Sequence, residues 1–192
     1  MVTEIIEKEK RWKMKKSFII NVIGGPCAGK STMYSFLYAR MKTMSLSVEQ
    51  VQEVAKKLVW AEEFDTLNNQ YQVSMQQYKD LAAVYGKVDY IVTDGSLLHG
   101  LYYNRYNPTN VCDRAVTEKK IVELFFSFNN IVIFLKRGNW PYEQAGRIQN
   151  KEEADHVDKV LLEILHQYKI PYREFTSDEN QVDAMIQYIL SQ

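Results

Sequence analysis

The sequence predicts an α/β fold: a five-stranded, mostly parallel β-sheet with helices on both faces. Short apolar runs alternate along the chain with longer segments in which apolar residues recur at helical spacing. This alternation implies β-α-β crossovers, which keep consecutive strands parallel and cover the sheet on both sides. A glycine-rich octapeptide separates the first apolar run from the first helical segment, where α/β proteins commonly bind anions.

Five apolar, β-prone segments are expected to form the strands. They are residues 17–23, 46–51, 88–93, 130–135 and 171–175. The run at 17–23 is continuously apolar and ends in glycines, a pattern typical of a buried parallel strand that enters a tight loop. Ligands of open α/β sheets lie at the carboxyl ends of the strands. The residues that follow each strand are therefore the first candidates for a site.

Helices are expected wherever apolar residues recur three or four positions apart. The expected ranges are 30–44, 53–61, 73–85, 115–128, 157–165 and 181–190. Between the fourth strand and the helix at 157–165 lies a polar, glycine-containing stretch, residues 136–150, which is expected to form a short lid. The chain shows no internal repeat and no linker.

The composition favours a single domain, residues 1–192, that acts on small molecules. Lys plus Arg and Asp plus Glu number 24 each, so no net positive field draws the protein onto nucleic acid or an anionic membrane. Residues 1–16 form a charged, basic extension without the apolar core of a secretory signal, and the chain has only two cysteines. We expect a cytoplasmic protein with no membrane partner; the sequence leaves its oligomeric state open.

The glycine-rich octapeptide matches the Walker A pattern G-x-x-x-x-G-K-[ST] and lies between a predicted strand and a predicted helix. With the threonine that follows it, its nucleotide-binding candidates are Gly24, Gly25, Pro26, Cys27, Ala28, Gly29, Lys30, Ser31 and Thr32. Glycines let the backbone curl so that its N–H groups point at phosphate oxygens. We therefore expect ATP, with Lys30 at the β- and γ-phosphates, Ser31 on Mg²⁺ and Thr32 facing the α-phosphate.

Two carboxylates follow predicted strands. Asp94 comes directly after residues 88–93, where P-loop proteins hold the Mg²⁺ shell, so Ser31 and Asp94 are the predicted metal residues. The alternative for Asp94 is the cap of a turn. Glu53 follows the second strand, where a carboxylate can orient or deprotonate an acceptor hydroxyl. An exposed helical position fits Glu53 nearly as well.

Arginines border or lie within the predicted lid. Arg137 and Arg147 can neutralise charge on the transferring phosphoryl group, whereas neighbouring Lys136 fits ordinary surface charge as well. The aromatic run at 101–110 suits stacking on a planar acceptor, and helix packing explains it equally well. None of the three histidines, His99, His156 and His166, has metal-ligand spacing with a cysteine, and all are expected to be surface or cap residues.

Several motifs together carry a family resemblance that spans residue 18 to the final helix. They are the octapeptide with Thr32, Glu53-Val-Ala-Lys56, Thr93-Asp94-Gly-Ser-Leu with Tyr102-Tyr103, and Tyr142 to Arg147-Ile-Gln ahead of Glu152-Glu-Ala. With them the chain resembles the AAA_28-type P-loop kinases of phages and bacteria. That group is similar to the ribosylnicotinamide-kinase domain of NAD-metabolism regulators and, more distantly, to nucleoside and nucleotide kinases. The resemblance implies an acceptor site near Glu53 and Asp94 and a lid that carries Arg137 and Arg147.

We therefore expect an ATP- and Mg²⁺-dependent kinase of P-loop NTPase fold that acts on a nucleoside, nucleotide or related small acceptor. The predicted catalytic residues are Lys30, Glu53, Asp94, Arg137 and Arg147. Gly95 stands where nucleoside kinases commonly have arginine, and Lys56 where these relatives often have arginine, so the acceptor stays open.

Three alternatives remain. The protein is an NTPase, a nucleotide-binding regulatory or host-interaction protein without turnover, or a phage-type kinase of 5-hydroxymethyl pyrimidines in DNA. Net neutrality disfavours a nucleic-acid partner. The NTPase class is also weakened because no glutamate follows Asp94 to activate water. By analogy with the fold, adenine is expected near residues 176–180.

Overall fold

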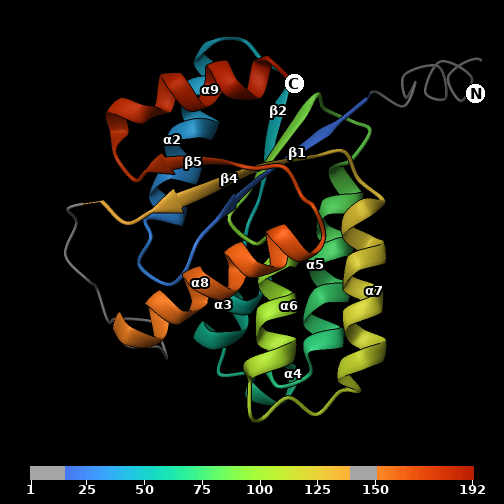
Figure 1. Cartoon of the computed structure of the whole chain (residues 1–192). Coiled ribbons are helices and arrows are strands. Elements are labelled where there is room, and N and C mark those ends of the chain that lie inside the picture. Colours follow the sequence, from blue (N-terminus) through green and yellow to red (C-terminus); the bar gives the residue numbers. More distant parts are fainter. Residues whose placement is uncertain (1–15, 139–150) are drawn as a thin grey trace, which may run out of the picture.

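The computed structural model describes residues 16–138 and 151–192, which are built around a five-stranded β-sheet (Figure 1). The strands are β1 (Phe18–Ile23), β2 (Val48–Val51), β3 (Tyr90–Thr93), β4 (Asn130–Lys136) and β5 (Arg173–Thr176). Their order is β2-β3-β1-β4-β5, and all four pairings are parallel. The predicted α/β class is thus confirmed, with a sheet that is wholly rather than mostly parallel in the described part of the chain.

Helices connect and cover these strands. They are α2 (Lys30–Thr43), α3 (Val54–Trp60), α4 (Phe64–Leu67), α5 (Gln70–Val84), α6 (Leu97–Tyr106), α7 (Arg114–Phe126), α8 (Lys151–Gln167) and α9 (Val182–Leu190), with a 3₁₀ turn at Glu179–Gln181. The six expected helices are confirmed with shifted ends, whereas α4 and α6 were not expected. Helix α6 lacks an amphipathic period because most of its residues are buried.

Side chains that alternate along β1 divide the core into two layers. Ile19 and Ile23 face the layer that also contains α5, α6, α7 and α8. Ile20 and Val22 face the opposite layer, which α2 and α9 cover. Figure 1 shows these two groups of helices on opposite sides of the sheet. Because both faces of the sheet are buried, the polar groups of a ligand site are confined to its edges.

Local caps set where helices begin. The side chain of Asn69 accepts a hydrogen bond from the backbone N–H of Gln72, so α5 begins at residue 70 and not at 73 as the apolar spacing alone predicted. The side chain of Asp113 bonds to the N–H of Val116 in the same way and starts α7. Asn and Asp are strong N-caps because their oxygens satisfy N–H groups that lack a partner in the helix.

The strand register brings the ends of β2 and β3 level at the carboxyl edge of the sheet, and β1 between β3 and β4 continues to Ile23. Thr93, the last residue of β3, pairs with Val51, the last residue of β2, on one side and with Asn21 of β1 on the other. The residues that follow β2 and β3 therefore meet the loop that follows β1.

The predicted N-terminal extension and lid fall largely on residues 1–15 and 139–150, which lie outside the described ranges. No helix in the described ranges has the length and apolar character needed to cross a bilayer.

Candidate active site

The loop between β1 and α2 is wound too tightly for ordinary side chains at its glycines. Gly24 has φ 152° and Gly29 has φ 78°, and a Cβ on Gly24 would lie 2.9 Å from the carbonyl oxygen of Leu135. Cys27 also adopts a left-handed conformation, with φ 59°, which is strained for a residue with a side chain. Runs of such conformations turn successive N–H groups inward, which is the geometry of an anion-binding nest.

The first turn of α2 has the features of an anion-binding helix N-terminus. Its N-cap, Gly29, offers no side chain to bond the first N–H groups, and the first turn contains no acidic residue. These N–H groups and the positive end of the helix dipole therefore face the loop. Nζ of Lys30 lies 2.9 Å from the carbonyl oxygen of Gly25, so the lysine reaches back along the loop toward the place that phosphates occupy.

Asp94 joins the ends of three strands. Its Oδ2 accepts a hydrogen bond from the hydroxyl of Ser31 at 2.8 Å, and its Oδ1 accepts one from the backbone N–H of Glu53 at 3.2 Å. Asp94 as a whole is 4% exposed. Ser31 begins α2 after β1, Asp94 follows β3, and Glu53 follows β2 as the N-cap of α3. Asp94 thus contacts two other predicted residues, Ser31 and Glu53, at the carboxyl edge.

The Ser31 hydroxyl and the Asp94 carboxylate fit a magnesium ion. Both present oxygen ligands, which Mg²⁺ requires, and Mg²⁺ usually takes only one or two protein ligands together with phosphate oxygens and water. Among the described residues, no three His, Cys, Asp or Glu side chains cluster as a metal site. The pair at Ser31 and Asp94 therefore suits an ion that arrives with a nucleotide.

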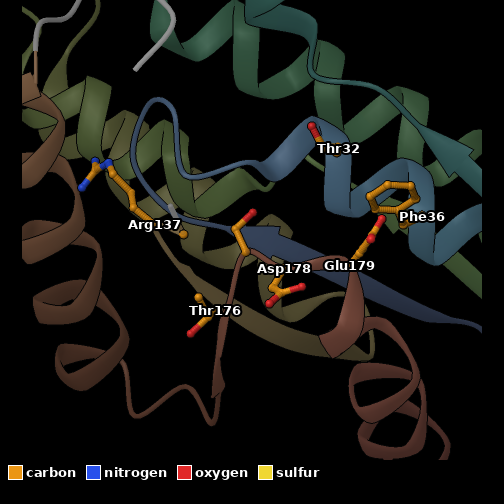
Figure 2. A pocket seen from close by; sticks show the side chains of 8 residues that line it. Thr32, Phe36, Arg137, Thr176, Asp178 and Glu179 are labelled. Atoms are coloured by element: carbon orange, nitrogen blue, oxygen red, sulfur yellow. The ribbon is translucent and has the colours of Figure 1, made fainter. Parts of the chain in front are cut away.

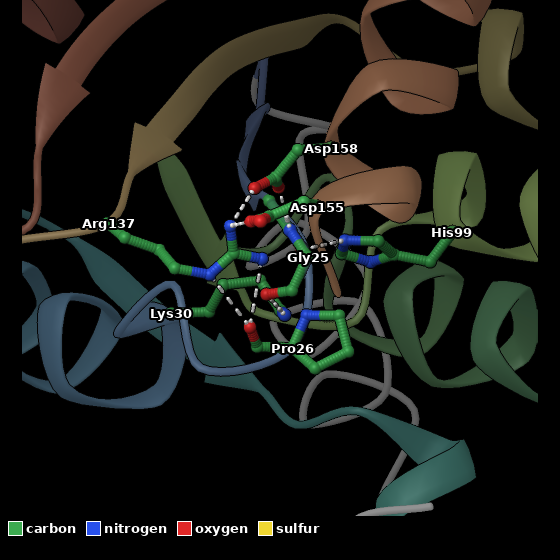
Figure 3. Close-up of polar contacts among 8 residues, drawn as sticks. Gly25, Pro26, Lys30, His99, Arg137, Asp155 and Asp158 are labelled. Carbon is green, nitrogen blue, oxygen red and sulfur yellow. Dashed lines mark hydrogen bonds and ion pairs between the residues drawn. The ribbon is translucent and has the colours of Figure 1, made fainter. Parts of the chain in front are cut away.

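Two carboxylates of α8 hold Arg137 against the phosphate loop (Figure 3). The guanidinium lies 2.6 Å from Asp155 and 2.6 Å from Asp158, and it also donates to the carbonyl oxygen of Pro26 at 3.2 Å. Asp158 accepts the backbone N–H of Gly25. Burial raises the pKa of Asp158, while the Gly25 N–H and Arg137 oppose that rise. The acidic pair was not singled out in the sequence.

A cavity of about 460 Å³ opens beside the loop on the α9 side (Figure 2). Its lining residues are Thr32, Phe36, Arg137, Gly138, Thr176, Ser177, Asp178 and Glu179. Its volume lies within the range of small-molecule sites. The buried hydroxyl of Ser177 has no hydrogen-bond partner in the described part of the chain. The cavity coincides with the region, residues 176–180, where adenine was expected.

A second, smaller cavity of about 30 Å³ lies between α3, α5 and α6. Glu53 lines it together with Gln77, Gly95 and His99. A Cβ on Gly95 would lie 2.6 Å from Oε1 of Gln77 and 2.6 Å from Cα of Glu53, so no side chain fits at this position. Glycine is therefore required at this position by close packing.

His99 is buried beneath the phosphate loop, so the expectation of a surface or cap residue was wrong. The residue is 6% exposed, and Nε2 of its ring lies 3.2 Å from the carbonyl oxygen of Gly24 (Figure 3). Burial, and secondarily the charge of Lys30, lowers the pKa of His99 to about 3. The residue is buried because α6, which carries it, packs under the loop. His156 and His166 are exposed, as expected.

Only some of the remaining candidate residues lie near the site. Arg147 lies outside the described residues. Tyr102 is buried and stacks with Tyr106, which favours the helix-packing interpretation, while Tyr103 lines the smaller cavity. Arg105 pairs with Glu118 at 2.6 Å, away from the loop. Two features of the sequence could have pointed to the contacts described above. They are the acidic residues at helical spacing in α8, Asp155 and Asp158, and His99, which follows soon after Asp94. Neither feature by itself indicates a contact with the phosphate loop.

The fold and the site together define a P-loop protein with a nucleotide-kinase-like fold. The family model described as an AAA domain, AAA_28, matches residues 19–181, and the chain belongs to this family. In fold it is similar to thymidylate kinase from Candida albicans, with 17% sequence identity, 92% of each chain covered and a TM-score of 0.56. No curated protein matches the chain. The predicted family resemblance is thereby confirmed, while the roles of individual residues stay predictions.

The left-handed conformation of Cys27 predicts opposite effects of two substitutions. Cys27→Gly removes the strain of a side chain at φ 59° and should raise the free energy of unfolding by up to about 1 kcal/mol. Cys27→Val adds a β-branched side chain and should lower it by about 1–2 kcal/mol. Urea denaturation measures both, and a valine variant as stable as the native protein would contradict the strained loop.

The buried, neutral His99 predicts a loss of stability in acid. Its pKa of about 3 lies below the value of about 6.5 in an unfolded chain, so the unfolded state binds more protons between these values. Stability should fall as the pH drops through this window, on the order of 1 kcal/mol per pH unit. Denaturation of the native protein and of His99→Gln at pH 7 to 4 measures the difference, because the other groups are common to both. Parallel pH profiles would show that His99 titrates normally.

Proposed function

We propose that the protein is an ATP- and Mg²⁺-dependent kinase that transfers the γ-phosphoryl group to the hydroxyl of a nucleoside, nucleotide or related small acceptor. The observation that carries this proposal is the contact of Asp94 with both Ser31 and the N–H of Glu53. This contact connects the phosphate loop to Asp94, the proposed metal carboxylate, and to Glu53, a second carboxylate residue at the same edge of the sheet. Phosphoryl transfer needs mainly such positioning and charge stabilisation.

The donor nucleotide is assigned to the phosphate loop and the larger cavity. Thr32 belongs to both, since it follows the loop in α2 and lines the cavity. The phosphates would lie against the N–H groups of the loop with Lys30 beside them, and the base would enter the cavity near Ser177. The unpartnered Ser177 hydroxyl offers a hydrogen bond to that base. Bound Mg²⁺, held by Ser31 and Asp94, would neutralise charge on the phosphate oxygens.

The acceptor is assigned to the opposite side of the loop, where Glu53 lines the smaller cavity. In the reaction, the acceptor hydroxyl oxygen forms a bond to the γ-phosphorus, and the bond from that phosphorus to the β,γ-bridging oxygen breaks with its electrons leaving on ADP. The hydroxyl proton passes to a carboxylate. Both oxygens of Asp94 accept hydrogen bonds from the fold, which suits anchoring. We assign proton acceptance to Glu53 because it lines the cavity that is assigned to the acceptor.

Arg137 is assigned to charge stabilisation at the transferring group. It already touches the loop through Pro26 and is 21% exposed. Because Asp155 and Asp158 neutralise it, a nucleotide must compete with these carboxylates for the guanidinium. The same role is proposed for Arg147, which lies outside the described residues.

Glu53→Gln tests the proposed base. The variant should bind ATP within twofold of the native affinity, because the backbone N–H that bonds Asp94 is kept, and should lose about 10²–10⁴-fold in turnover. Glu63→Gln, an exposed glutamate that precedes α4, is the matched control and should keep full turnover. Unchanged turnover of Glu53→Gln would remove Glu53 from the mechanism.

Transfer from γ-labelled ATP with Mg²⁺ to a panel of nucleosides, nucleotides, nicotinamide riboside and 5-hydroxymethyl-pyrimidine DNA tests the reaction class, with Lys30→Ala as the blank. Label in one acceptor, absent from the blank, is the expected result. Label released only as free phosphate would make the protein an NTPase. Nucleotide binding without any Lys30-dependent turnover would support a binding protein.

A further inference from the structure

Helix α8 packs directly against one end of the phosphate loop. A Cβ on Gly25 would lie 2.5 Å from the carbonyl oxygen of Ala154 and 2.9 Å from Oδ1 of Asp158, so only glycine allows this approach. At the contact, Oδ1 of Asp158 accepts the backbone N–H of Gly25 (Figure 3). An N–H group of an anion-binding loop is thus bonded to a carboxylate of the protein itself.

This end of the loop is the one that would receive the terminal phosphate of a nucleotide. In a Walker A loop the lysine reaches the β- and γ-phosphates. Nζ of Lys30 lies 2.9 Å from the carbonyl oxygen of Gly25, the same residue whose N–H bonds Asp158. Burial raises the pKa of Asp158, and the charge of Lys30 is among the effects that oppose this rise, so the two side chains interact. Asp158 therefore lies where the γ-phosphate is expected.

Asp158 also binds a second cation at this end of the loop, Arg137. The guanidinium lies 2.6 Å from Asp158, and its Nε and Nη2 atoms donate to the carbonyl oxygen of Pro26 at 3.3 Å and 3.2 Å. Asp155 is a further carboxylate partner of Arg137, also at 2.6 Å. A loop N–H, a guanidinium and the charge of a lysine are the groups that hold phosphate in proteins, and here they surround a carboxylate.

We propose that the carboxylate of Asp158 occupies the place of the γ-phosphate and thereby determines how strongly the protein prefers ATP to ADP. The terminal phosphate of ATP must displace this carboxylate from Arg137 and from the N–H of Gly25 before it can bind to them. ADP lacks that phosphate and leaves the contacts of Asp158 in place. The inference rests on the proposed function for the assignment of ATP to the phosphate loop, but it concerns binding and is measurable without turnover.

Charge gives the direction of the effect. The Asp158 carboxylate and a γ-phosphate are both negative, so they repel each other and compete for the same guanidinium and the same N–H. Both effects weaken the binding of ATP. Asparagine at this position keeps an oxygen for the N–H of Gly25 but removes the charge. The native carboxylate therefore lowers the affinity for ATP relative to that for ADP.

The same exchange of partners would favour phosphoryl transfer away from ATP. Once the γ-phosphoryl group has left, Asp158 can bond again to Arg137 and to the N–H of Gly25. These bonds stabilise the complex with ADP relative to the complex with ATP. Asp158 would thus determine nucleotide preference without touching the reacting atoms.

Calorimetric titration of a non-hydrolysable ATP analogue and of ADP, each with Mg²⁺, tests this inference in the native protein and in Asp158→Asn. The variant should bind the ATP analogue at least about tenfold more tightly, whereas its affinity for ADP should change less than about twofold. The ADP titration also reports whether the loop of the variant is intact. Asp183→Asn is the matched control, because it makes the same change of charge in an exposed residue that pairs with Arg40, and it should leave both affinities within about twofold.

Asp155→Asn is a second variant that separates the two carboxylates. The side chain of Asp155 is 60% exposed against 19% for that of Asp158, so water screens its charge more strongly. It should show the same preference for the ATP analogue at a smaller size, about twofold to fivefold. The exposed position makes loss of folding an unsuitable explanation for its result, so a variant without any gain for ATP over ADP would overturn the inference. A gain as large as that of Asp158→Asn would do the same, because it would place the competition at the guanidinium alone.

Two results with Asp158→Asn would contradict the proposal. Equal changes in the affinities for the ATP analogue and for ADP would show that Asp158 does not occupy the place of the γ-phosphate. Weaker binding of both nucleotides would show that Asp158 instead holds the loop in the shape that binds them.

The titrations and the transfer of label from γ-labelled ATP distinguish this inference from the proposed function. A selective gain for the ATP analogue in Asp158→Asn, with no acceptor labelled by the native protein, would disprove the kinase assignment and support the role of Asp158. A labelled acceptor together with equal changes for both nucleotides would do the reverse, because it would establish the kinase and overturn the inference.

Discussion

The contact network of one buried carboxylate, Asp94, is the constraint on which the site depends. The carboxylate of a residue that is 4% exposed must be hydrogen-bonded, and its two oxygens accept hydrogen bonds from the Ser31 hydroxyl and from the N–H of Glu53. These partners belong to different strand-to-helix junctions, so they meet only if β2, β3 and β1 are parallel and in register. The pairing of Thr93 with both Val51 and Asn21 provides that register. Sheet topology thus determines which side chains are close enough to act together.

The phosphate loop separates two cavities of different character. On the α9 side the cavity of about 460 Å³ reaches Ser177, and on the α6 side the cavity of about 30 Å³ reaches Glu53. Loop contacts fix this division, because Arg137 and Asp158 hold Pro26 and Gly25 on one side and His99 holds Gly24 on another. A donor and an acceptor bound in the two cavities would approach each other at the loop, as phosphoryl transfer requires.

Much of the fold and the phosphate loop of the candidate site could be predicted from the sequence, because their signals are local. Apolar runs identify strands buried on both faces, and the Walker A pattern is contained in eight consecutive residues. Asp94 and Glu53 could be nominated because each follows a strand. Helix α6 could not be predicted, since a helix buried on most sides lacks the amphipathic period that reveals helices.

The contacts of His99 and Arg137 could not be predicted from the sequence for a related reason. The burial of His99 depends on α6 lying under a loop that is 75 residues away in sequence. Arg137 was nominated as a lid cation, but its neutralisation by Asp155 and Asp158 depends on how α8 docks against the loop. The spacing of charged residues within a helix does not reveal which residue of another segment they contact. The chemistry of a residue can be read locally, whereas its pKa and its partners are properties of tertiary packing.

The most direct test of this account is the dependence of ATP affinity on Mg²⁺ in the native protein and in Asp94→Asn. If Asp94 and Ser31 hold the metal of the nucleotide complex, Mg²⁺ should tighten ATP binding at least tenfold in the native protein and less than twofold in the variant, which keeps an acceptor for the Ser31 hydroxyl. An equal effect of Mg²⁺ on both proteins would show that the metal lies elsewhere, and the carboxyl-edge site would have to be abandoned.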